Sequence, residues 1–285
     1  MPAMVGTAHI APQGIAFRKM HGLGNDFVVL DQRSIELGLV PSLVRAIGDR
    51  HCGVGFDQLA AVHLGADTDI ELMFWNADGS TAGACGNATR CIAGWIMAES
   101  GVRRLTLRTE RGVLSARLRP DDVVEVDMGA PMLDWQDVPL RQQLDTAILP
   151  IEGTPAACSM GNPHCTFFVE DADAVDLAGW GGQIEHHPLF PERTNVQFVQ
   201  VLSPDRARVR VWERGVGVTL ASGSSSCAVL VNANRRGLMG RRATLVLDGG
   251  EIEITWADND HVLMAGPTAH VFDGQLSPEW IEANT

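Results

Sequence analysis

This chain repeats one of its own patterns 137 residues further along. In each copy a tryptophan opens a polar segment, and ten residues later comes a cysteine or serine between an alanine and a glycine. The matched positions are Trp75/Trp212, Cys85/Ser222 and Gly24-Asn25/Gly161-Asn162. One offset shared by three separated matches indicates two copies of one α/β unit. Two such loops facing each other are expected to form a cleft with one reactive side chain on either side.

Size and composition favour a soluble protein of two domains. A chain of 285 residues suits two domains of about 140 residues each. Its residues are 45% hydrophobic and 20% charged, and no run approaches the roughly 18 apolar residues of a membrane-spanning helix. We predict a loose leader at 1–14, which lacks the features of a secretory signal. The first half then covers 15–131 plus 268–285 and carries Cys85, and the second covers 132–267 and carries Ser222.

Charge and cysteine usage exclude several classes of partner. The 22 basic and 35 acidic residues leave a net charge of −13, which repels nucleic acid. The six cysteines contain no C-x-x-C pair and are expected to be thiols, because the chain has no export signal. The nine histidines show no metal-ligand spacing, so we predict no metal site.

Hydrophobic periodicity predicts mixed α/β halves, barrel-like, each a sheet wrapped around one apolar central helix. The central helices are expected at Asn87–Ser100 and Ser224–Arg236, each followed by a glycine, with short peripheral helices at Ser42–Asp49 and Asp176–Gly181. Hairpin turns are expected at Glu110–Gly112 and Asp248–Gly250. The expected strands are Ala16–His21, Phe27–Asp31, Ile70–Asn76, Leu105–Arg108, Leu114–Leu118, Val123–Asp127, Thr166–Val169, Val196–Val201, Ala207–Val211, Ala243–Leu247, Glu251–Thr255 and His261–Ala265.

The segment Cys85-Gly86-Asn87 is placed where a cysteine gains reactivity. A helix N-terminus exposes unpaired N–H groups and the positive end of the helix dipole, which bind anions and favour a thiolate. Gly86 allows close backbone approach, and Asn87 suits either a helix cap or a ligand contact. A buried structural cysteine is the alternative, and that is how we interpret Cys91. The duplicated loop favours a functional role for Cys85.

Polar residues at the neighbouring strand and loop ends complete a candidate site. Asn76 and Asp78 suit substrate contacts, although Asp-Gly is also a common turn. Arg214 suits a bidentate grip on a carboxylate, although it could instead form a surface ion pair with Glu213. Asn25 and Asn162 are matched across the repeat and suit an amino acid head group. His164 could tune a thiol or relay a proton, because the reference pKa of histidine is near neutrality.

At these residues the sequence resembles the diaminopimelate epimerase family of cofactor-independent, two-base amino acid racemases. The resemblance runs from about Phe17 to Gly274. It rests on the motifs KMHGLGNDFVVLD, GVGFDQL, NADGSTAGACGNATRC, SMGNPHC, RTNVQFV and VWERGVGVTLASGSSSCA. The resemblance implies a homodimer in the cytoplasm, a small-molecule amino acid substrate, no cofactor and no metal.

The resemblance also implies residue roles. Cys85 becomes one catalytic base, with His164 and Glu213 assisting the proton transfers. The helix-start residues that hold the carboxylate of the reacting centre are Gly86, Asn87, Gly223 and Ser224. The remaining substrate contacts are Asn25, Gln58, Asn76, Asn162, Asn195, Glu213 and Arg214.

The chain departs from the family pattern at three positions. Thr81 and Val218 stand where relatives carry acidic residues, and Ser222 stands where the family has its second catalytic cysteine. A hydroxyl is a far weaker acid than a thiol, so Ser222 touches the mechanism directly. Three interpretations stay open. Ser222 relays protons through His164, Glu213 or water in a working epimerase; the chemistry has become one-base, as in a dehydratase or an epimerase of another substrate; or the fold survives as a catalytically weak amino acid binder.

Overall fold

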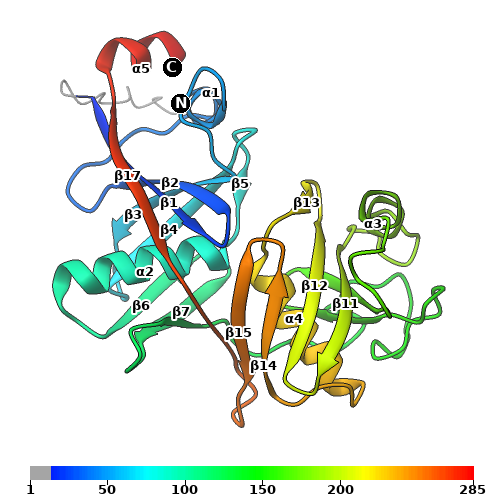
Figure 1. The fold of residues 1–285 in the computed structure, drawn as a ribbon. Coiled ribbons are helices and arrows are strands. Elements are labelled where there is room, and N and C mark those ends of the chain that lie inside the picture. Colours follow the sequence, from blue (N-terminus) through cyan, green and yellow to red (C-terminus); the bar gives the residue numbers. More distant parts are fainter. Residues whose placement is uncertain (1–13) are drawn as a thin grey trace, which may run out of the picture. The chain divides into compact units, whose positions relative to one another are not determined.

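The computed structural model describes residues 14–285, so the predicted leader lies almost entirely outside the described residues. The chain forms two compact units, one of residues 14–22, 26–114 and 268–285 and one of residues 23–25 and 115–267. Residues 115–131, expected in the first half, pack with the second unit because β8 (Val124–Asp127) pairs with β16 (Val262–Gly266). Both units are mixed α/β with more strand than helix, as the periodicity predicts (Figure 1).

The first unit is built on a parallel pair of strands extended on both sides, because β2 also pairs with β1. β2 (Asn25–Asp31) runs parallel to β3 (Gln58–Leu64), which is antiparallel to β4 (Ile70–Asn76). β4 also pairs with β5 (Thr81–Ala82) and with β6 (Arg104–Thr109). The last strand of the chain, β17 (Ala269–Leu276), pairs with β1 (Ile15–Gly22), so the C-terminal segment belongs to this unit.

Helices cover these strands. α2 (Gly86–Ser100) is the predicted central helix, and its Cys91, Ile92 and Ala93 are fully buried. It ends at Gly101, whose φ of 74° is the left-handed conformation that a glycine adopts freely after a helix. α1 (Pro41–Gly48) and α5 (Pro278–Asn284) lie together and enclose a cluster of Val44, Ile47 and Ile281.

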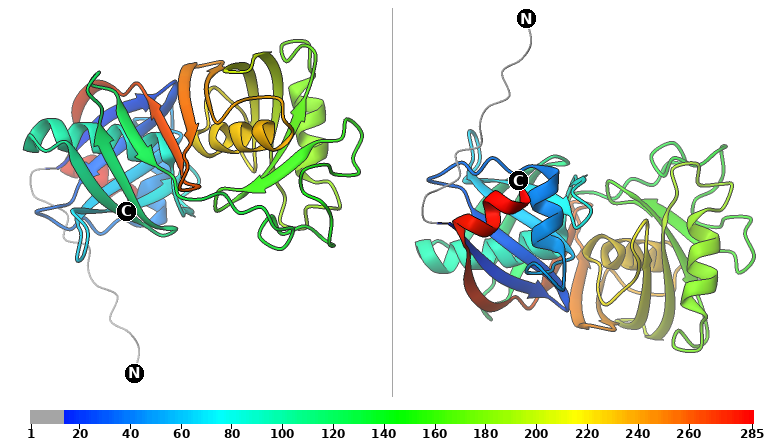
Figure 2. Two further views of the ribbon diagram at one scale, coloured as in Figure 1. Left: turned by 90° about the horizontal axis from the view of Figure 1, so that it is seen from below. Right: turned by 90° about the horizontal axis from the view of Figure 1, so that it is seen from above.

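The second unit repeats this plan. β10 (Pro163–Phe168) and β11 (Asn195–Ser203) are parallel, and β12 (Arg206–Glu213) is antiparallel to β11. The other strands are β7 (Gly112–Leu118), β8, β9 (Ala156–Ser159), β13 (Gly217–Thr219), β14 (Arg242–Leu247), β15 (Gly250–Trp256) and β16. The helices are α3 (Leu177–Glu185) and α4 (Gly223–Arg235). α4 runs among the strands of its unit (Figure 2), and all its residues from Cys227 to Ala233 are 0% exposed.

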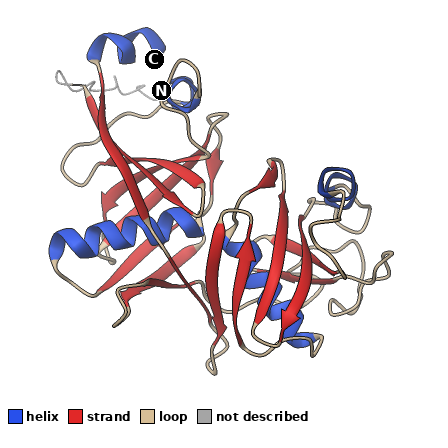
Figure 3. Cartoon of the chain, viewed as in Figure 1, coloured by secondary structure: helices blue, strands red, loops and turns tan. Residues whose placement is uncertain are grey.

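Strand pairing confirms the duplication that the sequence predicts. Phe27 pairs with Gln58 in the first unit, as His164 pairs with Asn195 in the second. Likewise Trp75 pairs with Leu59 and Thr81, and Trp212 pairs with Val196 and Val218, all at the offset of 137. The central helices α2 and α4 begin at matching residues and lie against matching strands (Figure 3).

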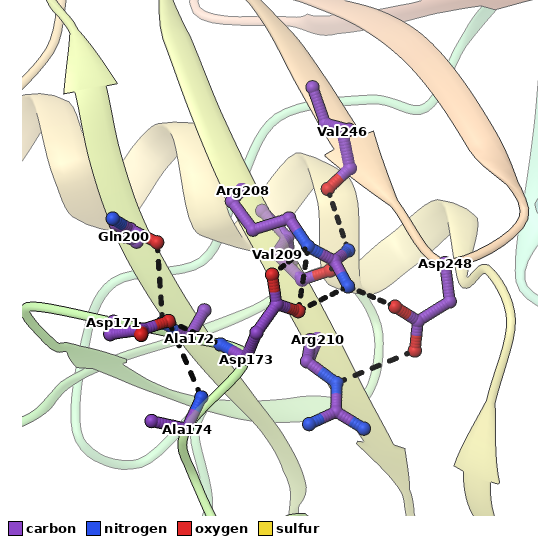
Figure 4. A network of polar contacts seen from close by, with 10 residues as sticks. All are labelled: Asp171, Ala172, Asp173, Ala174, Gln200, Arg208, Val209, Arg210, Val246 and Asp248. Atoms are coloured by element: carbon purple, nitrogen blue, oxygen red, sulfur yellow. Dashed lines mark hydrogen bonds and ion pairs between the residues drawn. The ribbon is translucent and has the colours of Figure 1, made fainter.

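An ion-pair network ties the outer face of β12 to its surroundings (Figure 4). The Arg208 guanidinium lies 2.7 Å from Asp173 in the loop before α3 and also pairs with Asp248 in the β14–β15 turn. Arg210 lies 3.5 Å from the same Asp248. The network joins three segments around the strand that ends at Glu213.

The sequence missed several elements. Strands β3, β5, β9 and β13 and helix α5 were not predicted, whereas both predicted hairpin turns are present. No helix among residues 14–285 is long and apolar enough to cross a membrane. In the same residues no three His, Cys, Asp or Glu side chains cluster as a metal site would require.

Candidate functional site

Cys85 is the residue immediately before α2. Its carbonyl accepts hydrogen bonds from the backbone N–H and the hydroxyl of Thr89, both at 2.9 Å. Its side chain does not cap its own helix, and Sγ lies 3.5 Å from Gln58 Oε1 on β3. The thiol is therefore held beside the helix N-terminus without closing it, which leaves the dipole available to an anion.

Ser222 occupies the matching place before α4. Its carbonyl accepts from the backbone N–H of Ser226 at 3.0 Å and from the Ser226 hydroxyl at 2.8 Å. Its side chain again does not cap the helix, and Oγ donates to Glu213 Oε2 at 3.1 Å. The second loop thus joins a hydroxyl to a carboxylate, where the first joins a thiol to an amide.

Asn87 differs from one sequence expectation. It is 2% exposed and lies inside the first turn of α2, so it is not the residue that caps the helix. Its Oδ1 accepts a hydrogen bond of 3.0 Å from the fully buried Arg90. Arg90 was not predicted as a site residue, because nothing in its spacing distinguishes it from an exposed helical arginine.

The sequence of the loop after β4 suits either substrate contacts or a turn. Asn76 ends the strand, and its Nδ2 donates to Ser80 Oγ at 3.0 Å. Asp78 accepts from the hydroxyl and the backbone N–H of Ser80, and these hydrogen bonds lower the pKa of Asp78. Gly79 follows with a φ of 84°. Asp78 therefore serves the turn, while Asn76 faces it from the strand end.

The Asn162 loop leads into a buried histidine. His164 is 0% exposed, and its Nε2 lies 3.0 Å from Asn162 Oδ1. The other ring nitrogen, Nδ1, lies 3.0 Å from Gln197 Nε2 on β11. Gln197 was missed by the sequence, although a glutamine in the apolar run of β11 is the kind of signal that could have found it. The matched loop begins at Asn25, which is 8% exposed.

Asn195 fixes the segment that carries Glu213 and Arg214. Its Nδ2 donates to Pro163 O at 2.9 Å, and its Oδ1 accepts the backbone N–H of Arg214 at 3.0 Å. The Arg214 guanidinium donates to Glu192 O at 3.0 Å. The Glu213 carboxylate accepts from Ser222, so the sequence-adjacent Glu213-Arg214 pair is drawn to different partners.

A buried carboxylate, that of Glu185, also holds this segment. Glu185, at the end of α3, accepts from Trp212 Nε1 at 2.7 Å and from the backbone N–H of Gly215 at 2.9 Å. These two donors bracket Glu213 and Arg214. Glu185 was not predicted, because its role depends on the packing of α3 against β12.

The sequence profile of the diaminopimelate epimerase family matches residues 17–133 and 156–271. The chain belongs to this family. Diaminopimelate epimerases of Acidiphilium cryptum and Rhodospirillum centenum are each 53% identical to it. The alignments cover 91% of this chain and 95% of the first relative, and 92% of this chain and 92% of the second.

Solved structures with low sequence identity share the fold. A PhzF-family phenazine biosynthesis protein of Bacillus anthracis is 14% identical, with a TM-score of 0.66 over 93% of this chain and 99% of its own. A hydroxyproline epimerase of Agrobacterium vitis is 13% identical, with a TM-score of 0.64 over 94% of both chains. The two-halved fold of the diaminopimelate epimerase family therefore extends well beyond its close relatives.

Proposed function

We propose that this chain interconverts L,L- and meso-2,6-diaminopimelate, a step in making lysine and cell-wall precursors. One residue removes the α-proton, and another delivers a proton to the opposite face, without pyridoxal phosphate. The observation that carries the proposal is the pair of matched helix starts, Cys85 before α2 and Ser222 before α4, in a chain that belongs to the family. The two side chains would act on opposite faces of the α-carbon.

Cys85 is the base on one face. A thiol has a reference pKa of about 8.5, and a helix N-terminus favours its thiolate. Gln58 orients the sulfur through the 3.5 Å contact and carries no proton acceptor strong enough to compete for the substrate proton. Cys85 therefore needs no second residue to act as a base.

Ser222 acts with Glu213 on the other face. Ser222 Oγ takes the α-proton while its own proton passes to Glu213 Oε2, 3.1 Å away, so the pair ends as a serine hydroxyl and a carboxylic acid. The reverse step returns the proton from Glu213 through Ser222 to the carbanion. His164 is less suited to this relay, because its two ring nitrogens are engaged by Asn162 and Gln197.

Backbone N–H groups stabilise the charge that develops on the reacting carboxylate. The starts of α2 and α4 offer such groups at the residues after each base. The carboxylate contacts are Gly86, Asn87, Gly223 and Ser224. The rest of the substrate is held by Asn25, Gln58, Asn76, Asn162, Asn195, Glu213 and Arg214.

The alternatives raised by Ser222 are not favoured. The relatives of Acidiphilium cryptum and Rhodospirillum centenum, each 53% identical to this chain, are diaminopimelate epimerases, and Glu213 gives Ser222 the proton acceptor that two-base epimerisation requires. The resemblance further supports a homodimer in the cytoplasm. Light scattering coupled to size-exclusion chromatography tests the dimer, and cell fractionation tests the location.

Proton NMR in deuterated water tests the activity. Purified protein with L,L- or meso-diaminopimelate should exchange the α-proton for deuterium and form the other isomer. Because the two bases differ, we expect unequal exchange from the two isomers, with faster incorporation where Cys85 is the base. Absence of both exchange and epimerisation in folded protein contradicts the function, and equal exchange rates contradict the unequal bases.

A further inference from the structure

A continuous chain of hydrogen bonds runs through the interior of the second unit to His164. Asn232 Nδ2 on α4 donates to Thr166 Oγ1 at 3.0 Å, and Thr166 Oγ1 donates to Gln197 Oε1 at 2.9 Å. Gln197 Nε2 then contacts His164 Nδ1 at 3.0 Å and Ser225 Oγ at 3.1 Å. Asn232, Thr166, Gln197, His164 and Ser225 are each 0% exposed. Gln197 is the branch point, joining the histidine to the first turn of α4.

The first unit shows that the fold does not need these polar groups. At the offset of 137, Thr166, Gln197, His164 and Ser225 correspond to Val29, Ala60, Phe27 and Ala88. Those four apolar residues are 1%, 0%, 0% and 0% exposed. Burying an amide or hydroxyl costs free energy unless its hydrogen bonds are made, so an apolar interior is the simpler solution. The polar chain is thus specific to the half that carries Ser222.

The donors and acceptors along this chain define the state of the imidazole. Gln197 uses its carbonyl oxygen for Thr166, so its NH2 group faces His164 Nδ1, which must then be the acceptor. The proton of a neutral imidazole consequently sits on Nε2 and is donated to Asn162 Oδ1. With Oδ1 occupied in this way, Asn162 presents its NH2 group as a hydrogen-bond donor.

We infer that Gln197 is a positioning residue, which fixes His164 with its proton on Nε2 and thereby fixes Asn162 as a donor toward the carboxylate of the substrate. The inference rests on the proposed function for the identity of the substrate. The protonation of His164 on Nε2 does not depend on that function. Through Ser225 the same amide also holds the first turn of α4, directly after Ser222 and Gly223. One buried side chain therefore sets two parts of the second half-site.

Nitrogen-15 NMR of the histidine rings tests this directly in the full-length protein. His164 is assigned by its loss in His164→Gln. The native protein should show a neutral ring protonated on Nε2. Gln197→Glu keeps the size of the side chain but replaces its NH2 donor by an acceptor, so the ring should gain a proton on Nδ1. Gln197→Met should leave the tautomer unrestrained. Gln200→Glu serves as the matched control. Gln200 lies on the same strand, and its Oε1 accepts a long hydrogen bond of 3.4 Å from Ala172 N.

Kinetics supply the second readout. Both Gln197 variants should lower kcat/KM for diaminopimelate by about 10- to 100-fold, as misplacement of substrate-binding groups does. Part of the loss should be a raised KM, because Asn162 binds the substrate. Thermal unfolding identifies a variant that fails to fold. If one of the two Gln197 variants does not fold, the test rests on the other. A native ring protonated on Nδ1, or an unchanged ring state in a folded Gln197→Glu, overturns the inference. An inactive native protein with the expected ring states instead counts against the proposed function alone.

Discussion

The two halves share a backbone frame but give their helix-start residues different partners. In the first, Cys85 contacts Gln58 on β3, a neutral amide. In the second, Ser222 contacts Glu213 at the end of β12, a carboxylate. The residue that matches Gln58 in the second half is Asn195, which binds backbone instead. The Ser222 hydroxyl therefore bonds to a residue of β12, whereas the strand that matches the partner of Cys85 is β11.

The difference follows from acidity. A thiol near a helix N-terminus ionises close to neutral pH, whereas a serine hydroxyl needs a neighbouring base to accept its proton. A thiol can therefore act as a base beside a neutral amide, whereas a hydroxyl requires a neighbouring base. We therefore expect a hydroxyl at this fold position to support proton transfer only when the neighbouring strand end supplies a base.

Cys85→Ser should have the largest effect. The new hydroxyl would face Gln58, which cannot take its proton, so we expect epimerisation to fall by about 10⁴-fold, the upper range for losing general base catalysis. Turnover of L,L-diaminopimelate measures the loss. Cys52→Ser, at an exposed cysteine outside the site, is the control and should retain activity. Near-native activity in Cys85→Ser would show that the partner does not matter.

Glu213→Gln tests whether a carboxylate at position 213 is needed only when residue 222 is a hydroxyl. In the native background we expect kcat to fall by about 10²-fold, because Ser222 loses its proton acceptor. In a Ser222→Cys background the same change should cost less than about tenfold in kcat, with any remaining loss in KM. Ser222→Cys alone should increase epimerisation.

Equal losses in both backgrounds would mean that Glu213 contacts substrate without serving Ser222. Loss of activity in Ser222→Cys itself would show that the second loop has been rebuilt around the hydroxyl. Both outcomes are measured on four proteins with the same substrate: the native protein, Glu213→Gln, Ser222→Cys and the double variant.

The sequence predicted the strands and helices that the two halves share, because these elements depend mainly on local sequence. The 137-residue offset, the strand ending at Asn76 and the helix stopped by Gly101 all follow from periodicity and glycine placement, and the structure has them. The family motifs identified Cys85 and Ser222 as a pair. The strand end and the helix end depend on residues that lie close together along the chain, and the offset is found by comparing the sequence with itself.

The contacts that distinguish the halves could not be predicted in this way. Ser222 and Glu213 are nine residues apart, but their bond depends on the angle between a strand end and a helix start. Gln197 meets His164 across 33 residues, and Glu185 meets Trp212 across 27. Polar residues in an apolar strand signal that a partner exists, but only packing decides which one.

Gly22→Ser tests a steric difference between the halves. A Cβ at Gly22 would lie 2.8 Å from the Arg90 guanidinium and 3.2 Å from Asn87 Cβ. The matched residue of the second half is Ser159, and Cys227 stands where the first half has Arg90. We expect Gly22→Ser to lower the free energy of unfolding by about 1–3 kcal/mol, as overpacking does.

Denaturant unfolding measures that loss. Gly182→Ala is the matched control, because its added Cβ would meet only Trp212, at 3.6 Å or more, within α3. An alanine in a helix is favoured over glycine, so the control should be neutral or slightly stabilising. A Gly22→Ser protein as stable as the control would show that Arg90 and Asn87 move without cost.

Asp26→Asn should have the smallest effect, and one that depends on pH. Burial alone would raise the pKa of Asp26, but hydrogen bonds from Arg50 and Lys19 hold it below its ordinary value. A carboxyl with a lowered pKa stabilises the fold above its unfolded value near 4, and that stability is lost as pH falls through the folded pKa. The matched residue of the second half is Pro163, which has no charge to lose.

We therefore expect Asp26→Asn to lower the free energy of unfolding by about 1–2 kcal/mol at pH 7, from the loss of charge-assisted hydrogen bonds. The deficit should shrink when urea unfolding is repeated below about pH 4, because the unfolded carboxyl is protonated first and the stability from the lowered pKa is lost as pH falls through the folded pKa. Asp67→Asn removes a carboxylate that is 65% exposed and should change stability little at either pH. A deficit that stays constant with pH would mean that Asp26 stabilises the fold through the packing of its side chain and not through its charge. Asp26 would then fill its place near the start of β2 as Pro163 fills the matching place at the start of β10.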